Sequence, residues 1–314
     1  MNSLLHIHNA DVYVTGSNSK FLSSDVITQF RGRGDEIHVY PLSFSEYVPA
    51  CQGSVDEAWD DYLIYGGMPL ILTMAEPEDK AAYLNSLFQK VYISDIVERH
   101  DVRNKVELDE LVDILASAIG SYTNQSKLVR TFKSVKGKTI SDKTIKNYID
   151  YLIDSFLISK AVRYDIKGKK YIGSPSKYYF EDVGLRNARL GFRQVEQTHL
   201  MENIIYNELR IRGYHVDVGV VEYYGVNGEG KRGKKQLEVD FVATKGSEKH
   251  YIQSAFTLPT ADKVDQEQRS LLHIPDSFRK IIVVGDNIKI RRDENGIITI
   301  GLRNFLLDED SLRL

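Results

Sequence analysis

The stretch QLEVDFVATKGSEKHYIQSAFTL, residues 236–258, decides how the last third of the chain folds. Its two halves have the composition of strands, and KGSE at residues 245–248 supplies the turn between them. A hairpin centred on that turn places Asp240 directly opposite Gln253, and strand alternation puts Ala255 on the face that carries Gln253. The stretch therefore predicts an antiparallel strand pair with two polar side chains opposite each other.

The segments around this hairpin complete an α/β unit. We expect a helix over about residues 195–212, and then a first strand at YHVDVGVV, residues 214–221. After the hairpin, a helix is expected near residues 261–273 and a last strand at KIIVVG, residues 280–285. The order α-β-β-β-α-β predicts a self-sufficient α/β domain over residues 195–314.

The segment SDKTIKNYIDYLIDSF, residues 141–156, predicts a helix in the middle of the chain, which Ser141 can cap. An earlier helix is expected over residues 108–119, and ISKAVRYD, KGKK and KYYF predict a two-stranded ribbon over residues 158–180. A helix pair followed by such a ribbon is the order of a winged helix, which we place at residues 108–182. The apolar side chains at helical spacing are Ile145, Tyr148, Ile149, Leu152 and Phe156.

Positive charge is concentrated in this central region. The second helix of a winged helix can enter the major groove while the wing contacts phosphate, so Lys143, Lys146 and Asn147 are candidate DNA-binding residues. Winged helices also dock proteins, and lysine runs are often solvated faces, so a protein partner or a second copy of the chain remains an alternative. The basic residues are Lys127, Arg130, Lys133, Lys136, Lys138, Lys143, Lys146, Lys160, Arg163, Lys167, Lys169 and Lys170, against Asp142, Asp150, Asp154 and Asp165.

The first fifty residues indicate the later part of an α/β domain. DVYVT at residues 11–15 and EIHVYPL at residues 36–42 predict strands, and FLSSDVITQF at residues 21–30 predicts a short helix between them. Two strands and one helix cannot cover both faces of a parallel sheet, so we expect the rest of that sheet upstream. Residues 51–107 are predicted to be mainly helical, with a first helix over residues 55–65.

The composition excludes several classes of protein. A chain of 314 residues with 44 acidic and 41 basic side chains is typical of a soluble globular protein of roughly two or three domains. Its apolar runs are shorter than the ~20 residues of a membrane helix, and the start MNSLLHIHNADV lacks the features of a signal peptide. We therefore expect a cytoplasmic protein with no membrane partner. A single cysteine, Cys51, rules out an internal disulfide and a multi-cysteine zinc site.

Residues 11–47, DVYVTGSNSKFLSSDVITQFRGRGDEIHVYPLSFSEY, resemble a segment of bacterial and archaeal AAA-type ATPases that carry a C-terminal domain of unknown function. The segment follows the Walker B strand in that family, and the GSN turn, the GR pair and the PLSFxEY tail carry the resemblance, which extends over nearly the whole chain. It implies that Asn18 is a sensor of the γ-phosphate or attacking water, and that Arg33 is a phosphate-sensing arginine. It also implies that the full-length parent uses ATP and Mg²⁺.

The phosphate cradle of such ATPases does not occur in this sequence. The motif G-x-x-x-x-G-K-[ST] has its nearest match at Gly225, Gly230 and Lys231, where Arg232 replaces the hydroxyl residue and a strand follows in place of a helix. No acidic Walker B strand precedes Asp11. We therefore expect the chain to begin inside its ATPase domain, to hydrolyse no ATP, and to hold neither a cofactor nor a metal.

The C-terminal unit resembles the restriction-endonuclease-like fold in its order of elements. The resemblance implies a metal site in which Glu202, Asp240 and Gln253 take part, with the E-x-K pair of that fold falling on Gln253 and Ala255. A neutral amide and a methyl group replace the glutamate and the lysine, so Mg²⁺ loses a charged ligand and the attacking water loses its positioning partner. We expect a degenerate, inert site on a fold kept as a binding or assembly scaffold.

Together these features predict four regions. A partial AAA ATPase sheet occupies residues 1–50, a helical lid or linker residues 51–107, a winged helix residues 108–182, and a restriction-endonuclease-like domain residues 195–314. The expected function is that of a fragment of an ATP-binding AAA-type ATPase, an ATP-driven switch linked to DNA or to a protein partner. Two alternatives are an ATP-independent winged-helix binding module and a metal-dependent nuclease.

Overall fold

The computed structural model describes residues 35–137, 139–226 and 232–313, together with Asp11, Tyr13, Thr15 and Gly16. The helix predicted at residues 21–30 lies outside the described residues, as do Asn18 and Arg33. The strand predicted at residues 11–15 is described at only some of its positions, so it stays a prediction.

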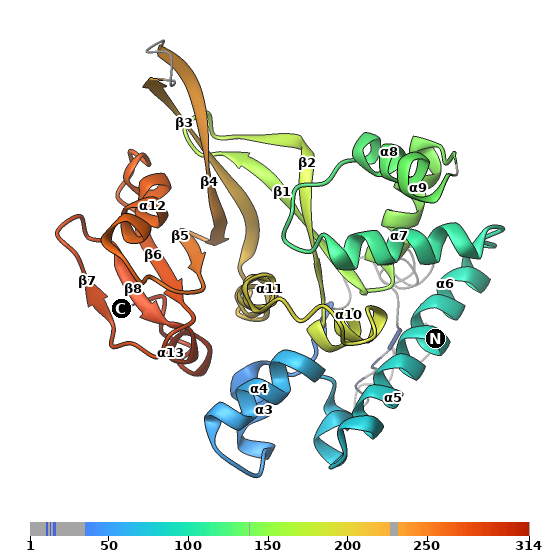
Figure 1. The fold of residues 1–314 in the computed structure, drawn as a ribbon. Coiled ribbons are helices and arrows are strands. Elements are labelled where there is room, and N and C mark those ends of the chain that lie inside the picture. Colours follow the sequence, from blue (N-terminus) through green and yellow to red (C-terminus); the bar gives the residue numbers. More distant parts are fainter. Residues whose placement is uncertain are drawn as a thin grey trace.

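Eight described strands form one mixed sheet in the order β2-β1-β3-β4-β5-β6-β8-β7 (Figure 1). The pairs β1–β3, β5–β6 and β6–β8 are parallel, and the other neighbours are antiparallel. The strands are β1 (Ile158–Asp165), β2 (Lys170–Phe180), β3 (His215–Val226), β4 (Arg232–Lys245), β5 (Glu248–Ala255), β6 (Arg279–Val284), β7 (Arg291–Arg292) and β8 (Ile298–Gly301).

The predicted ribbon is present as β1 and β2, and it is continuous with the C-terminal strands. Arg163 of β1 pairs with Val218 of β3, and Asp165 pairs with Val220. The central and C-terminal regions, which the sequence suggests as separate units, therefore share one sheet.

The hairpin β4–β5 has the predicted register. Phe241 pairs with Ile252 and Lys245 with Glu248, so the turn lies where the KGSE sequence places it. On its other side β4 carries a bulge, because the pairing with β3 shifts between Asp217 and Gly219.

The helices agree closely with the sequence patterns that predict them. Helix α4 spans Val55–Tyr65, and its capping box joins Ser54 to Glu57. Ser141 caps α9 by accepting a hydrogen bond from the Thr144 N–H. Helix α9 spans Asp142–Asp154. The other described α-helices are α3 (Phe44–Tyr47), α5 (Pro77–Leu87), α6 (Ser94–Arg99), α7 (Lys105–Ser117), α8 (Gln125–Lys136), α10 (Val183–Arg189), α11 (Gln197–Ile211), α12 (Ala261–Leu272) and α13 (Leu302–Leu307). A π-helical turn, Phe88–Ile93, joins α5 to α6.

The prediction of a strand at residues 36–42 is wrong. This segment pairs with none of the described strands and runs as an extended strap whose last N–H, that of Leu42, donates to the Gly67 carbonyl 2.9 Å away. The strap is held by side chains: the His38 ring meets Phe156 edge-on at 4.6 Å, and the Tyr40 ring lies 5.3 Å from the Arg210 guanidinium. His38 and Tyr40 thus hold the strap, whereas its β-branched residues, Ile37 and Val39, are 78% and 86% exposed.

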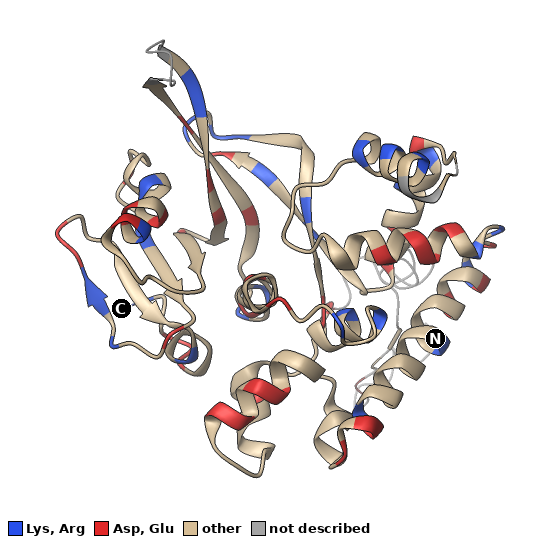
Figure 2. Cartoon of the chain, viewed as in Figure 1, with Lys and Arg blue, Asp and Glu red and all other residues tan. Residues whose placement is uncertain are grey.

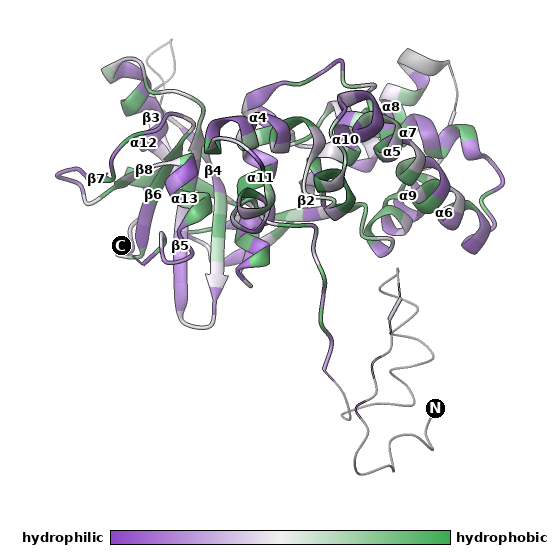
Figure 3. Ribbon diagram, turned by 90° about the horizontal axis from the view of Figure 1, so that it is seen from below, coloured by the Kyte–Doolittle hydropathy of each residue, from purple (hydrophilic) through white to green (hydrophobic). Residues whose placement is uncertain are grey.

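Helices cover the sheet on two faces. Leu200 and Ile205 of α11 pack with Phe241 and Ile252 on one face, whereas Leu271 of α12 belongs to the cluster on the other face. A third cluster joins α5 to α9 with the ends of β1 and β2. Figure 3 shows the C-terminal strands with α12 and α13 at one end of the molecule, α5 to α9 at the other, and α10 and α11 between them. None of the described helices combines the length and apolar character that a membrane crossing requires.

Candidate functional site

A buried ionic cluster lies where β2, β4 and α11 meet. The ammonium Nζ of Lys177 is 2.9 Å from Oε1 of Glu202 and 2.6 Å from Oε1 of Glu238, and the Lys177 side chain is only 4% exposed. Asp240 lies next to these carboxylates, and its Oδ2 accepts a hydrogen bond of 2.8 Å from the Ser254 N–H. One lysine therefore serves a group of three carboxylates taken from two regions of the chain.

The local sequence explains how these side chains come together. Lys177 and Tyr179 alternate on β2, so both point to the same face, and the Tyr179 hydroxyl donates to Glu202 at 2.6 Å. The bulge in β4 turns Asp240 away from regular alternation. Gly120 has φ +70° and its Cα faces Glu202, where an added Cβ would come within 3.1 Å of a carboxylate oxygen. A glycine thus fits both the backbone conformation and the space.

The electrostatics of the cluster require a cation at its centre. Burial alone would lower the pKa of Lys177, but the carboxylates of Glu202, Asp240 and Glu238 raise it above the ordinary range, so the side chain stays charged. Burial, followed by the charge of Glu202, raises the pKa of Asp240, while Lys177 acts in the opposite direction. Three carboxylates this close together repel one another, and the lysine offsets that repulsion.

The residues predicted for a nuclease site do not all take part in this cluster. Glu202 and Asp240 belong to it. Gln253 lies on β5, and its Oε1 accepts a hydrogen bond of 3.4 Å from Ser270 of α12. Ala255 is buried in the cluster of apolar residues beneath α12. Within the part of the chain that the structure describes, no group of three or more His, Cys, Asp or Glu residues has an arrangement that could hold a metal ion.

Sequence reasoning missed the role of Lys177. The signal was a lysine at the start of the run KYYF, because a charged residue in a strand that is otherwise apolar needs a partner when it is buried. That partner could not be identified locally, since Glu202 is 25 positions further along the chain.

A second candidate region is the exposed basic face of α8 and α9, which we call the basic face. Lys143 and Lys146 of α9 are exposed, and Asn147 beside them is partly buried. Three exposed cations of α8, Lys127, Arg130 and Lys133, complete it. Over residues 35–137 and 139–226, none of the five cations makes an ion pair with another described residue. Figure 2 shows basic residues on both helices.

Comparison with known proteins gives two family matches. A model described as an AAA domain matches residues 2–48, and one described as a domain of unknown function, DUF8612, matches residues 56–196. The chain is 35% identical over 312 residues to an uncharacterized protein of Haemophilus influenzae, covering 98% of this chain and 73% of that protein. It is 29% identical to uncharacterized protein MJ1544 of Methanocaldococcus jannaschii, covering 89% of this chain and 62% of that protein.

A solved structure also shows limited similarity. The crystal structure of protein VC1899 from Vibrio cholerae aligns with 89% of this chain and 62% of its own, with 14% sequence identity and a TM-score of 0.28. A score this low does not establish a shared fold. The match of residues 2–48 to an AAA domain model is a similarity of sequence alone.

Proposed function

We propose that this chain, which belongs to the same family as the uncharacterized Haemophilus influenzae protein, binds nucleic acid through the basic face and does not cleave the bound nucleic acid. In this proposal residues 108–182 act as a winged helix, with Lys143, Lys146 and Asn147 of α9 closest to the nucleic acid. The carrying observation is the set of five exposed cations on α8 and α9 that have no ion-pair partner among the described residues.

The order of elements supports this assignment. Helices α7, α8 and α9 are followed by the ribbon β1–β2, and Thr123, between α7 and α8, forms a bridge with Ser176 of β2. A winged helix has three helices, a two-stranded wing and a short strand segment between its first two helices. Cations that are not neutralised by neighbouring carboxylates are free to displace counterions from phosphate.

The buried cluster supports a role in which the protein binds nucleic acid but does not hydrolyse it. Phosphodiester hydrolysis of the nuclease type needs a divalent cation held by carboxylates and a positioned water. Glu202, Glu238 and Asp240 share the ammonium of Lys177. This ammonium lies where a nuclease would hold its divalent cation, and it ties β2 to α11 and β4. We propose that Glu202 and Asp240 are what is left of a degenerate nuclease site whose carboxylates now stabilise the fold, and that Gln253, hydrogen-bonded to Ser270, no longer takes part in it.

An ATP-driven switch in the longer parent protein is part of the same proposal, with Asn18 and Arg33 as sensors and with ATP and Mg²⁺ bound by the parent. The AAA match ends at residue 48, and Phe44 and Tyr47 of α3 are buried in the same cluster as α11. A movement at this junction would therefore be transmitted to the sheet. Because the chain contains no G-x-x-x-x-G-K-[ST] motif, its own nucleic-acid binding should not require ATP.

Fluorescence anisotropy with a labelled DNA duplex tests the proposal. Lys143→Glu with Lys146→Glu should weaken duplex binding by at least tenfold, because two phosphate contacts become repulsive. The matched control is Lys90→Glu with Lys289→Glu, which makes the same charge change at exposed positions outside the basic face. Equal affinities of the two double variants would rule out the basic face as the binding surface.

A further inference from the structure

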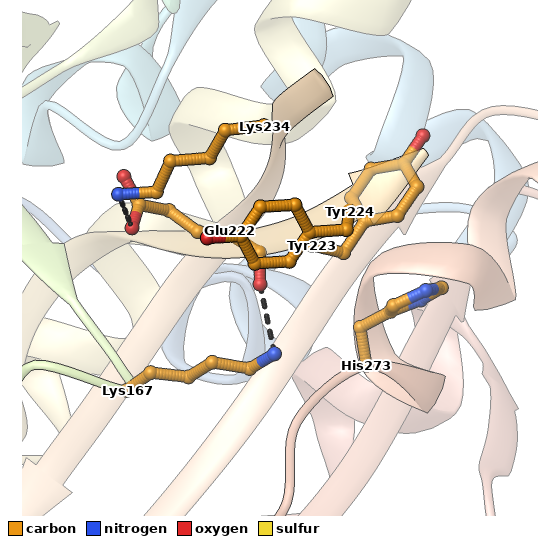
Figure 4. Close-up of a pocket in the computed structure, with 6 residues that line it drawn as sticks. All are labelled: Lys167, Glu222, Tyr223, Tyr224, Lys234 and His273. Atoms are coloured by element: carbon orange, nitrogen blue, oxygen red, sulfur yellow. Dashed lines mark hydrogen bonds and ion pairs between the residues drawn. The ribbon is translucent and has the colours of Figure 1, made fainter. Parts of the chain in front are cut away.

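A pocket lies where the β3–β4 arm meets the β1–β2 turn and the end of α12. Its volume is about 500 Å³, within the size range of small-ligand sites. The proposed function does not use it. Six residues line it: Lys167, Glu222, Tyr223, Tyr224, Lys234 and His273 (Figure 4).

The polar groups of the pocket leave it with positive charge. The carboxylate of Glu222 is already satisfied, because it pairs with Lys234 and accepts a hydrogen bond of 3.1 Å from Nε2 of Gln236. Among the residues that the structure describes, Lys167 has only a neutral partner, since its Nζ donates to the backbone carbonyl of Glu222 at 2.8 Å. The exposed lysines 169 and 170 in the adjoining turn add to this charge. An anionic ligand is therefore favoured.

Aromatic rings form the other part of the lining. The ring of Tyr223 lies 4.7 Å from that of His273 at an interplanar angle of 56°, so the two form one wall from β3 and the end of α12. Tyr224, the next residue on β3, is 80% exposed. A ring with so much of its surface open can receive a flat, apolar group from solution.

We infer that this pocket binds single-stranded nucleic acid, with a base stacked on the exposed ring of Tyr224 and a phosphate held by Lys167. Aromatic platforms beside cations are the combination that binds single strands without sequence preference. A duplex satisfies the lysine but not the rings, because its base faces are stacked inside the helix. An acidic peptide likewise uses the charge and leaves the rings without a partner.

This site is separate from the basic face of α8 and α9, and its test is separate as well. The probe is a fluorescein-labelled oligothymidylate of about 15 nucleotides, a length suited to non-specific single-strand sites, measured by anisotropy. Tyr224→Ala should weaken binding about 5- to 150-fold, the range found for the loss of one stacked base. Because Tyr224 is exposed, its truncation should leave the fold intact, which circular dichroism checks.

Two further variants define the ligand. Lys167→Ala should weaken binding and flatten its salt dependence, whereas Lys167→Arg should keep most of the affinity. The matched aromatic control is Phe256→Ala, which removes a ring that is 40% exposed and does not line the pocket. The inference is overturned if Tyr224→Ala binds the oligothymidylate like the Phe256→Ala control, or if a polyglutamate peptide displaces the strand at equal concentration. Loss of duplex binding in the Lys143 and Lys146 variant bears only on the proposed function.

Discussion

Lysines occupy two opposite environments in this molecule. Lys177 is buried among carboxylates and holds β2 against α11 and β4, whereas Lys143 and Lys146 on α9 are exposed and have no ion-pair partner among residues 35–137 and 139–226. The first is committed to the fold, because its charge offsets that of its neighbours. The other two are free to meet phosphate. The difference shows that the net charge of a region does not predict nucleic-acid binding until the ion-pair partners of each cation are known.

The largest expected effect comes from removing the buried lysine. Lys177→Met leaves Glu202, Glu238 and Asp240 without their cation, and breaking a buried ion pair from one side typically costs ~3–5 kcal/mol of unfolding free energy. Urea unfolding measures this, with Lys160→Met, an exposed lysine on β1, as the matched control. If both variants lose the same small amount of stability, Lys177 is not the cation that the cluster depends on.

A second buried charge sharpens the comparison, because it has backbone donors in place of an ion partner. Asp182 accepts hydrogen bonds from the N–H groups of Gly67 at 2.7 Å and Leu185 at 2.9 Å, and burial raises its pKa to about 6. The pKa of an aspartate in the unfolded chain is about 4. Between these values the folded state holds a proton that the unfolded state has released, so folding stability is lost as pH rises through this window.

Asp182→Asn tests that sign, because an amide does not titrate. From pH 4 to pH 7 the wild-type protein should lose roughly 2–3 kcal/mol of unfolding free energy relative to the variant. Urea unfolding at several pH values gives the difference, and Asp262→Asn, at an exposed position, serves as the control. A difference that grows in favour of the wild type as pH rises contradicts the assigned pKa direction.

A null result is expected for nuclease activity. Plasmid and linear DNA incubated with the protein in Mg²⁺ or Mn²⁺ should stay intact, because Gln253 and Ala255 supply neither a charged ligand nor a cation and Lys177 already occupies the acidic cluster. Gel electrophoresis detects nicking and linearisation. Cleavage that disappears in Asp240→Asn would show that the site is active after all.

Much of the local structure could be predicted from the sequence. The turn residues KGSE were enough to predict the register of β4–β5, and Ser141 was enough to predict where α9 begins. Both signals lie within a few residues of the structure that they specify. The strand prediction at residues 36–42 is wrong although the pattern alternates, because Ile37 and Val39 are 78% and 86% exposed and pair with no described strand. What decides strand formation there is a pairing partner, which local sequence does not reveal.

The long-range features were beyond prediction. The parallel pairing of Arg163 with Val218 joins the ribbon to the C-terminal strands across 55 positions, and nothing in either segment alone specifies it. The buried cluster depends on the same contact, because only a shared sheet brings Lys177 beside Asp240. Glu202 and Asp240 could be chosen from spacing and resemblance, whereas the lysine that completes their environment could not.

The salt dependence of duplex binding tests the central claim most directly. If Lys143 and Lys146 each neutralise one phosphate, the slope of log affinity against log salt should be about 1.8 units shallower for Lys143→Ala with Lys146→Ala than for the wild-type protein. The slope for Lys90→Ala with Lys289→Ala should equal that of the wild type. An unchanged slope in the α9 variant would contradict the account, because it would mean that the exposed lysines of the basic face do not contact the nucleic acid.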